Sequence, residues 1–250
     1  MMNRSDAGGK SRITARSAGI RPIVFPRNGR WEYLSQDSLT VSTFGIPAVF
    51  RRAFLRILSA SDVCYRRIFG ARSLGWIEFN AVKSDAEAVG LWTNGADRVF
   101  LKISREEQLY PPTHGGACHV YGLPHELAHI VLYRSLVNLS QLPEGWGEGW
   151  AHYLASFIAV PQLYAQFGTS LWPYPYNYME TEGPARCLRQ FTGVKLRRRD
   201  PVVAAAERLH KLEQRKGRSE FARFFRNLFA KPLLANQLER LILRELNGKS

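Results

Sequence analysis

The chain has 250 residues, of which 45% are hydrophobic and 22% are charged, so it can bury a sizeable core and is not a disordered chain. Its 20 glycines follow no three-residue period, which excludes collagen, and no apolar run approaches the roughly 18 residues of a membrane-spanning helix. The formal net charge of +14 divides into +6 for residues 1–30, −1 for residues 31–194 and +9 for residues 195–250.

The two basic ends predict a chain with appendages around one main domain. Residues 1–30 are rich in Gly, Ser and Arg and are predicted to be a disordered basic tail. We expect the main domain at 31–195 and a basic helical C-terminal subdomain at 196–250. A basic end attracts nucleic acid, anionic lipid or an acidic protein, so an anionic partner at the termini stays open beside the simpler interpretation of a solvated surface.

The first elements of the main domain are predicted from hydrophobic period. Apolar residues recur every three or four positions over 44–70, which predicts a helix ending at Gly70. Residues 76–82 alternate apolar and polar, as in a half-buried strand. The turn signal at 93–95 precedes a second predicted strand at 98–103 and favours antiparallel pairing there.

The rest of the chain is predicted to be helical. A helical period runs from 123 to about 137, a break follows at 142–147, and a second helix is expected at about 148–167 with a bend at Pro161. Alternate prolines exclude a helix at 172–178. Beyond that loop, two stripes predict helices that face a core: Phe221, Phe224, Phe225, Leu228 and Phe229, and Leu234, Leu238, Leu241 and Leu246.

The strongest motif is the sequence HELAH at residues 125–129. Residues four apart lie on one face of a helix, so the imidazoles of His125 and His129 can reach one metal ion. Glu126 lies beside them and can point at water. We therefore predict a zinc site with His125 and His129 as ligands.

A zinc site of this kind needs a third protein ligand. Glu148 lies 18 residues after His129, at the start of the next predicted helix, and a helix–loop–helix connection of that length lets the second helix return across the first. Two imidazoles and one carboxylate leave a fourth position for water. Glu144 is a competing carboxylate with a weaker local pattern, so Glu148 is favoured.

The segment HELAH followed by LPEGWGEGWAHY resembles the gluzincin metallopeptidases of the peptidase MA-like superfamily. Glu148, Gly149, Ala151 and Tyr153 match the start of that family's second helix, although only Gly147 separates Trp146 from Glu148. The resemblance implies a zincin-like α+β fold, in which a small mixed or antiparallel sheet packs on the HExxH helix and a helical C-terminal subdomain closes the cleft. The strong part covers 125–153, and a looser part covers 48–195.

The resemblance also implies an activity. We expect a zinc-dependent peptidase that hydrolyses a peptide or protein substrate, with Glu126 as the general base toward the water that Zn²⁺ activates. The strand at 98–103 is the candidate sheet edge for an extended peptide. Tyr178 is the candidate oxyanion donor, and Tyr174, Tyr176 and His210 are its alternatives.

Two other functions remain open. Residues 148–155, followed by Pro161, also resemble the cytosolic regulator peptidases that cleave repressor-type proteins, which carry Asn where His152 stands. That family would keep the same ligands and base. The rival from another class is a non-catalytic binding protein with structural or no zinc, whose basic ends contact nucleic acid.

Cysteine usage bears on location. The three cysteines form no Cys-x-x-Cys pair, and the basic N-terminal residues precede no apolar segment of the kind found in signal peptides. A cytoplasmic location is therefore expected.

Overall fold

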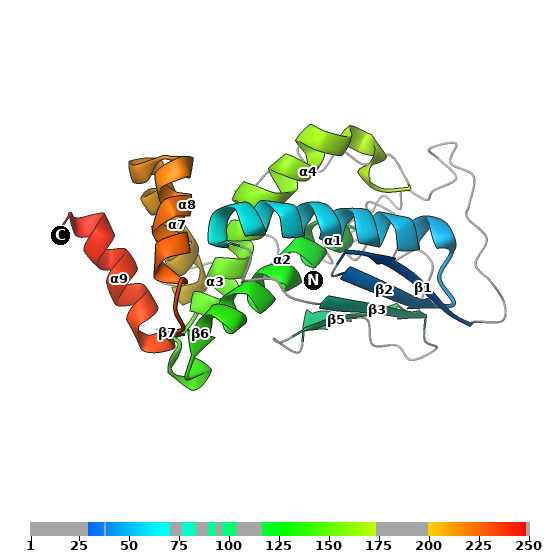
Figure 1. Cartoon of the computed structure of the whole chain (residues 1–250), viewed down its shortest axis with the longest axis horizontal. Coiled ribbons are helices and arrows are strands. Elements are labelled where there is room, and N and C mark those ends of the chain that lie inside the picture. The colour runs from blue at the N-terminus through cyan, green and yellow to red at the C-terminus, as the bar shows by residue number, and fades with distance from the viewer. Residues whose placement is uncertain are drawn as a thin grey trace, which may run out of the picture.

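The computed structural model describes residues 30–37, 39–70, 77–83, 90–93, 97–103, 117–173 and 200–248. Within these ranges the fold is α+β with a helical C-terminal region: a sheet lies at one end of the molecule, α7, α8 and α9 lie at the other, and α1 and α2 run between them (Figure 1). No helix of the described residues is both long and apolar enough to cross a membrane.

Five strands of the described residues form one mixed sheet in the order β1-β2-β3-β5-β4. The first pair, β1 (Trp31–Gln36) and β2 (Leu39–Phe44), is antiparallel. The next strands, β3 (Ile77–Lys83) and β5 (Arg98–Ile103), continue the sheet in parallel with β2. The outermost strand β4 (Gly90–Thr93) runs antiparallel to β5.

This topology confirms one expectation and corrects another. The antiparallel pairing that the turn signal favours is that of β4 with β5, and the Thr93 hydroxyl donates a hydrogen bond of 2.9 Å to the Arg98 carbonyl. The same strand is not a sheet edge, because β5 lies between β3 and β4. The outer strand is β4. Its four residues are too few to show an alternating pattern, so the sequence predicted the edge at 98–103 instead.

Helix α1 (Ala48–Phe69) packs its apolar face on β1, β2 and α2. Its buried stripe includes Phe50, Phe54, Ile57 and Leu58, as the helical period predicts. The helix begins four residues later than predicted, because Phe44 completes β2 and Gly45 then turns the chain at a φ of 67°. Gly70 ends the helix, and its N–H donates to the Arg66 carbonyl at 2.9 Å.

Helix α2 (Ala117–Ser135) carries the HELAH motif and packs on β4, β5 and α1. It begins six residues before the predicted start, so Pro124 lies inside the helix and not in its first turn. Proline has no N–H for the carbonyl four residues earlier. The Pro124 carbonyl accepts a hydrogen bond of 2.9 Å from the buried Tyr65 hydroxyl, which ties α2 to α1.

The predicted helix at 148–167 is three segments. These are α3 (Trp146–Tyr153), the π-helical η4 (Leu154–Ala159) and α4 (Val160–Phe167), which continues into the 3₁₀ turn η5 (Gly168–Leu171). Pro161 stands in the first turn of α4. The π-helical segment ends two residues before the proline, so the helix type changes at this point.

The C-terminal helices are α7 (Pro201–Lys216), α8 (Arg218–Leu228) and α9 (Ala235–Asn247). A two-residue parallel pair joins β6 (Leu136–Val137) to β7 (Leu233–Leu234), next to the 3₁₀ turn η3 (Leu139–Gln141). Phe225 packs on both Phe69 and Trp150, at ring-centroid distances of 5.7 and 5.2 Å. One hydrophobic core therefore continues from β2 to α9.

Candidate metal centre

The two histidines of HELAH lie one turn apart on α2 and face the same point. Their Nε2 atoms are 3.1 Å apart, and both side chains are buried. The neighbouring residues Leu127, Ala128 and Ile130 are fully buried and hold the rest of the helix in the core. The four-residue spacing thus acts as predicted, because the same helix that buries its apolar face presents both imidazoles together.

Glu148 reaches the histidines from α3, which lies beside α2 (Figure 1). Its Oε2 atom is 3.3 Å from His125 Nε2, and its Oε1 atom is 3.4 Å from His129 Nε2. One donor atom from each of the three residues lies within 4.8 Å of the others. His125, His129 and Glu148 can therefore hold one metal ion.

Tertiary contacts set the position of α3. The Trp150 indole N–H donates to the Ala128 carbonyl at 3.1 Å, which fastens α3 to α2 two residues after Glu148. On the opposite side, Gly149 lies so close to α7 that a Cβ there would stand 2.5 Å from the Val202 carbonyl oxygen. A helix that packs tightly on both sides holds its first carboxylate at the histidine pair.

The electrostatics suit a cation at this point. Burial lowers the pKa of His125, which favours the neutral imidazole that a metal requires. Hydrogen bonds from His125 and His129 hold the pKa of the Glu148 carboxyl well below its usual range, although 56% of that side chain is exposed. Neither histidine Nδ1 has a hydrogen-bond partner in the described part of the chain. With a metal bound, the imidazole protons would lie on Nδ1, and the Nε2 lone pairs would face the ion in place of the hydrogen bonds to Glu148.

Glu126 lies next to His125 but does not belong to the three donors. Its side chain is half-buried, and burial raises the pKa of its carboxyl to about 7, with the nearby His129 opposing and Glu148 adding to the rise. Its carboxyl is thus near enough to His129 and Glu148 for both to act on its pKa, and its role as a proton acceptor stays a prediction.

Three further side chains surround the donors. His152 is buried, with its Nε2 atom 3.9 Å from Glu148 Oε2 and its Nδ1 atom 2.5 Å from the Tyr121 hydroxyl. Tyr133 stacks on His129, with ring centroids 5.5 Å apart. The sequence analysis named His152 but neither tyrosine. The spacing of four residues that joins Tyr121, His125, His129 and Tyr133 could have indicated that both tyrosines share a helix face with the histidines.

Glu144 and His210 do not belong to the group of three donors. Glu144 is exposed in the turn before α3, outside the three-residue group. His210 on α7 stacks on Phe157 with ring centroids 4.5 Å apart. Tyr178, with its alternatives Tyr174 and Tyr176, lies outside the described residues, so its role as an oxyanion donor stays a prediction.

In comparisons with known proteins, no family model matches the chain and no curated protein matches it.

Proposed function

We propose that this protein is a zinc metallopeptidase of the gluzincin type, in the peptidase MA-like superfamily. The observation that carries the proposal is the convergence of His125, His129 and Glu148 from two helices, with Glu126 beside them. Two imidazoles and a carboxylate are the ligands of catalytic zinc sites that leave a position open, whereas structural zinc sites rely on cysteine.

The donor set fits zinc. Imidazole nitrogen and carboxylate oxygen both suit this ion, and the two Nε2 atoms can offer lone pairs when the imidazole protons lie on the unpartnered Nδ1 atoms. When bound, zinc polarises a scissile carbonyl and makes water a stronger acid. His125, His129 and Glu148 would hold the ion.

Glu126 supplies the proton chemistry in this proposal. Its carboxylate takes a proton from the attacking water and then gives it to the leaving amine. Because Glu126 points from the same helix as both histidines but lies outside the donor group, removing its charge separates proton transfer from metal binding. The oxyanion donor stays assigned to Tyr178.

The substrate of the proposed enzyme is an extended peptide. β4 is the outer strand of the sheet and contacts α2, so a peptide that pairs with its backbone would run past the HELAH helix.

Buried Cys64 is a free thiol, which supports the cytoplasmic location proposed from cysteine usage.

The test combines metal analysis with hydrolysis. Full-length protein should contain about one zinc per chain and cleave a protein substrate such as unfolded casein. Glu126→Gln should keep the zinc and lose about 10²–10⁴-fold of the hydrolysis rate, the usual contribution of a proton-transfer group. His125→Ala should lose zinc.

The outcomes separate the proposal from its rival. Wild-type hydrolysis in Glu126→Gln would overturn the mechanism. Metal-free protein that binds DNA in a salt-sensitive manner would favour the non-catalytic binding protein. Glu144→Gln is the matched control, because it neutralises an exposed carboxylate near the site without touching the donors.

A further inference from the structure

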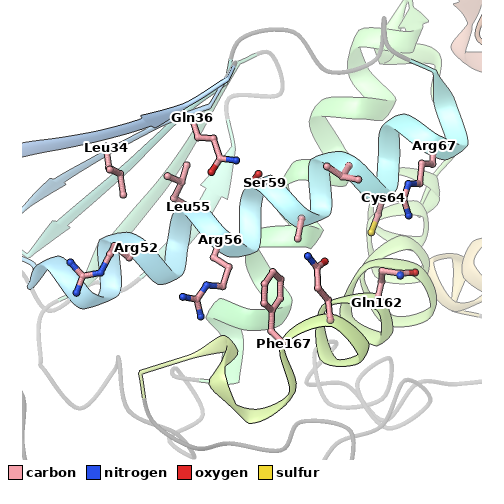
Figure 2. A pocket seen from close by; sticks show the side chains of 13 residues that line it. Leu34, Gln36, Arg52, Leu55, Arg56, Ser59, Cys64, Arg67, Gln162 and Phe167 are labelled. Carbon is pink, nitrogen blue, oxygen red and sulfur yellow. The ribbon is translucent and has the colours of Figure 1, made fainter.

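A groove runs between α1 and α4, and none of the three metal-site donors lines it. Its first part is a hollow of about 410 Å³ bordered by α1, α4 and β1 (Figure 2). A second hollow of about 400 Å³ adjoins the first, because Cys64, Arg67 and Gln162 line both. Each has the size of a ligand-binding cleft, which is about 300–1,000 Å³.

The described residues that line this groove carry only positive charge. Arg52, Arg56 and Arg67 line the first hollow and Arg218 the second, and no Asp or Glu of the described chain lines either. Figure 2 shows Arg52 and Arg56 toward one end of this stretch of α1 and Arg67 toward the other. A ligand that enters must therefore bring the negative charge.

Two of these arginines already have partners within the protein. Arg56 donates to the Ser170 carbonyl at 2.8 Å and lies over the Phe167 ring. Arg218 forms an ion pair with Glu213. By contrast, the exposed Arg52 and Arg67 have no carboxylate partner among the residues that the structure describes.

An uncharged stretch separates the two ends. Arg56 and Arg67 are eleven residues apart on α1, which is about 16 Å along the helix. Ser59, Ala60 and Val63 lie between them, and Val63 is 44% exposed. Gln162 and Gln166 of α4 form the opposite wall. The groove thus combines cationic ends with an apolar and amide-lined middle.

We propose that this groove binds an acidic, amphipathic peptide segment of a partner protein. The segment would place carboxylates at Arg52 and Arg67 and apolar side chains against Val63 and Leu55. Main-chain groups of the segment would meet the Gln162 and Gln166 amides. This site is independent of the proposed peptidase activity, because it shares no residue with the metal centre.

The spacing favours a peptide over nucleic acid. A DNA duplex carries about one charge per 1.7 Å of axis, so cations about 16 Å apart would leave most phosphates unpaired. Single strands rely on aromatic stacking platforms. The aromatic side chains among the described residues that line the two hollows are Phe167, whose ring Arg56 covers, and Phe157, which stacks on His210.

Fluorescence anisotropy of full-length protein tests the proposal. The probe is a labelled synthetic 14-residue peptide with two glutamates near each end and leucine and alanine between them. The matched probe carries glutamine for glutamate, and a 20-nucleotide oligothymidine represents nucleic acid. We expect saturable binding of the acidic peptide that weakens with salt, and at least tenfold weaker binding of the glutamine peptide.

Variants locate the binding. Arg52→Gln with Arg67→Gln should weaken binding of the acidic peptide about five- to tenfold, since two exposed ion pairs are lost. Val63→Glu should weaken it as well, because it places a carboxylate in the apolar stretch. The control Lys231→Gln with Arg240→Gln removes the same charge from two exposed positions outside the groove and should change little.

Three results would overturn the proposal. The first is that the acidic peptide shows no saturable binding. The second is that both charge-matched double variants weaken binding of the peptide equally. The third is that the Arg52 and Arg67 changes weaken binding of oligothymidine more than binding of the peptide. The last result would assign the groove to nucleic acid.

Discussion

Glu144 and Glu148 are only four residues apart in sequence, yet their surroundings differ. Glu148 stands 3.3 and 3.4 Å from the two histidine Nε2 atoms, whereas Glu144 is exposed before α3 begins. The carboxylate that can bind a metal is therefore the one that α3 carries to the histidines of α2.

This difference predicts the metal affinity of two variants. Glu148→Ala should weaken zinc binding by at least the 10–100-fold that follows loss of an outer-shell partner, since a direct ligand disappears. Glu144→Ala should retain wild-type affinity. Competition with a chromogenic chelator measures both, and equal affinity of wild type and Glu148→Ala would remove Glu148 from the ligand set.

Asp62 predicts a pH dependence of stability. Burial raises the pKa of its carboxyl, and the Arg66 guanidinium, with Nε at 2.8 Å, offsets this only in part; Asp37 and Arg134 act more weakly. The folded state therefore holds the Asp62 proton more tightly than the unfolded chain. Its stabilising contribution is present below the unfolded pKa near 4 and is lost as pH rises through the folded pKa.

Asp62→Asn, which cannot ionise, should accordingly gain stability relative to wild type between about pH 3 and pH 7. Urea unfolding at several pH values measures this trend. Glu32 provides a control of opposite sign, because the Arg51 guanidinium at 2.6 Å lowers the pKa of its carboxyl. Glu32→Gln should lose stability relative to wild type as pH rises. A pH-independent gap for Asp62→Asn would contradict the argument.

At the scale of elements, the placement of α3 decides whether the site exists. The helix is fastened to α2 by the Trp150–Ala128 hydrogen bond and to α7 through glycine contacts. Gly145 immediately precedes α3 and has a φ of 76°. A Cβ on this residue would lie 2.4 Å from the Pro201 carbonyl carbon. Small residues at both positions allow α7 to approach α3.

Gly149→Ala should therefore destabilise the α3–α7 contact. Its Cβ would meet the Val202 carbonyl oxygen at 2.5 Å and Ala205 Cβ at 2.6 Å, and overpacking of this kind costs about 1–3 kcal/mol. Thermal melting measures the loss. Ala165→Ser, which adds one heavy atom at an exposed α4 position, should leave the melting temperature within error of wild type. An equal melting temperature for Gly149→Ala would show that the helices can separate at no cost.

At the scale of the whole molecule, the sheet, α1 and α2, and the C-terminal helices share one core. Strand β1 begins at Trp31, whose ring lies 5.6 Å from that of Phe44. Residues 1–29 lie outside the described residues, so the basic tail at 1–30 stays a prediction. The separation of 31–195 from 196–250 stays a prediction.

Deletion of residues 1–30 should leave the melting temperature and zinc content unchanged, because a Gly-, Ser- and Arg-rich end has little to bury. The deletion removes a net charge of +6, so binding to anionic partners should weaken and depend less on salt concentration. Hydrolysis of a neutral peptide should stay the same. Thermal melts, metal analysis and a peptidase assay of both forms test this. A large fall in melting temperature would show that the tail packs on the domain.

The sequence alone determined the local half of the site. His125 and His129 converge because four residues make about one helical turn, and that relation needs no tertiary contact. The helices, and the strands at 77–83 and 98–103, likewise follow from hydrophobic period, since each buries one face.

Only the tertiary structure decided the rest. The parallel pairing of β3 with β5, the outer place of β4 and the meeting of Glu148 with the histidines join segments far apart in sequence. The same holds for the groove, where arginines of α1 face glutamines of α4 more than 90 residues later. Such contacts depend on how several buried faces pack at once, and a local pattern carries no information about which surface its partner will present.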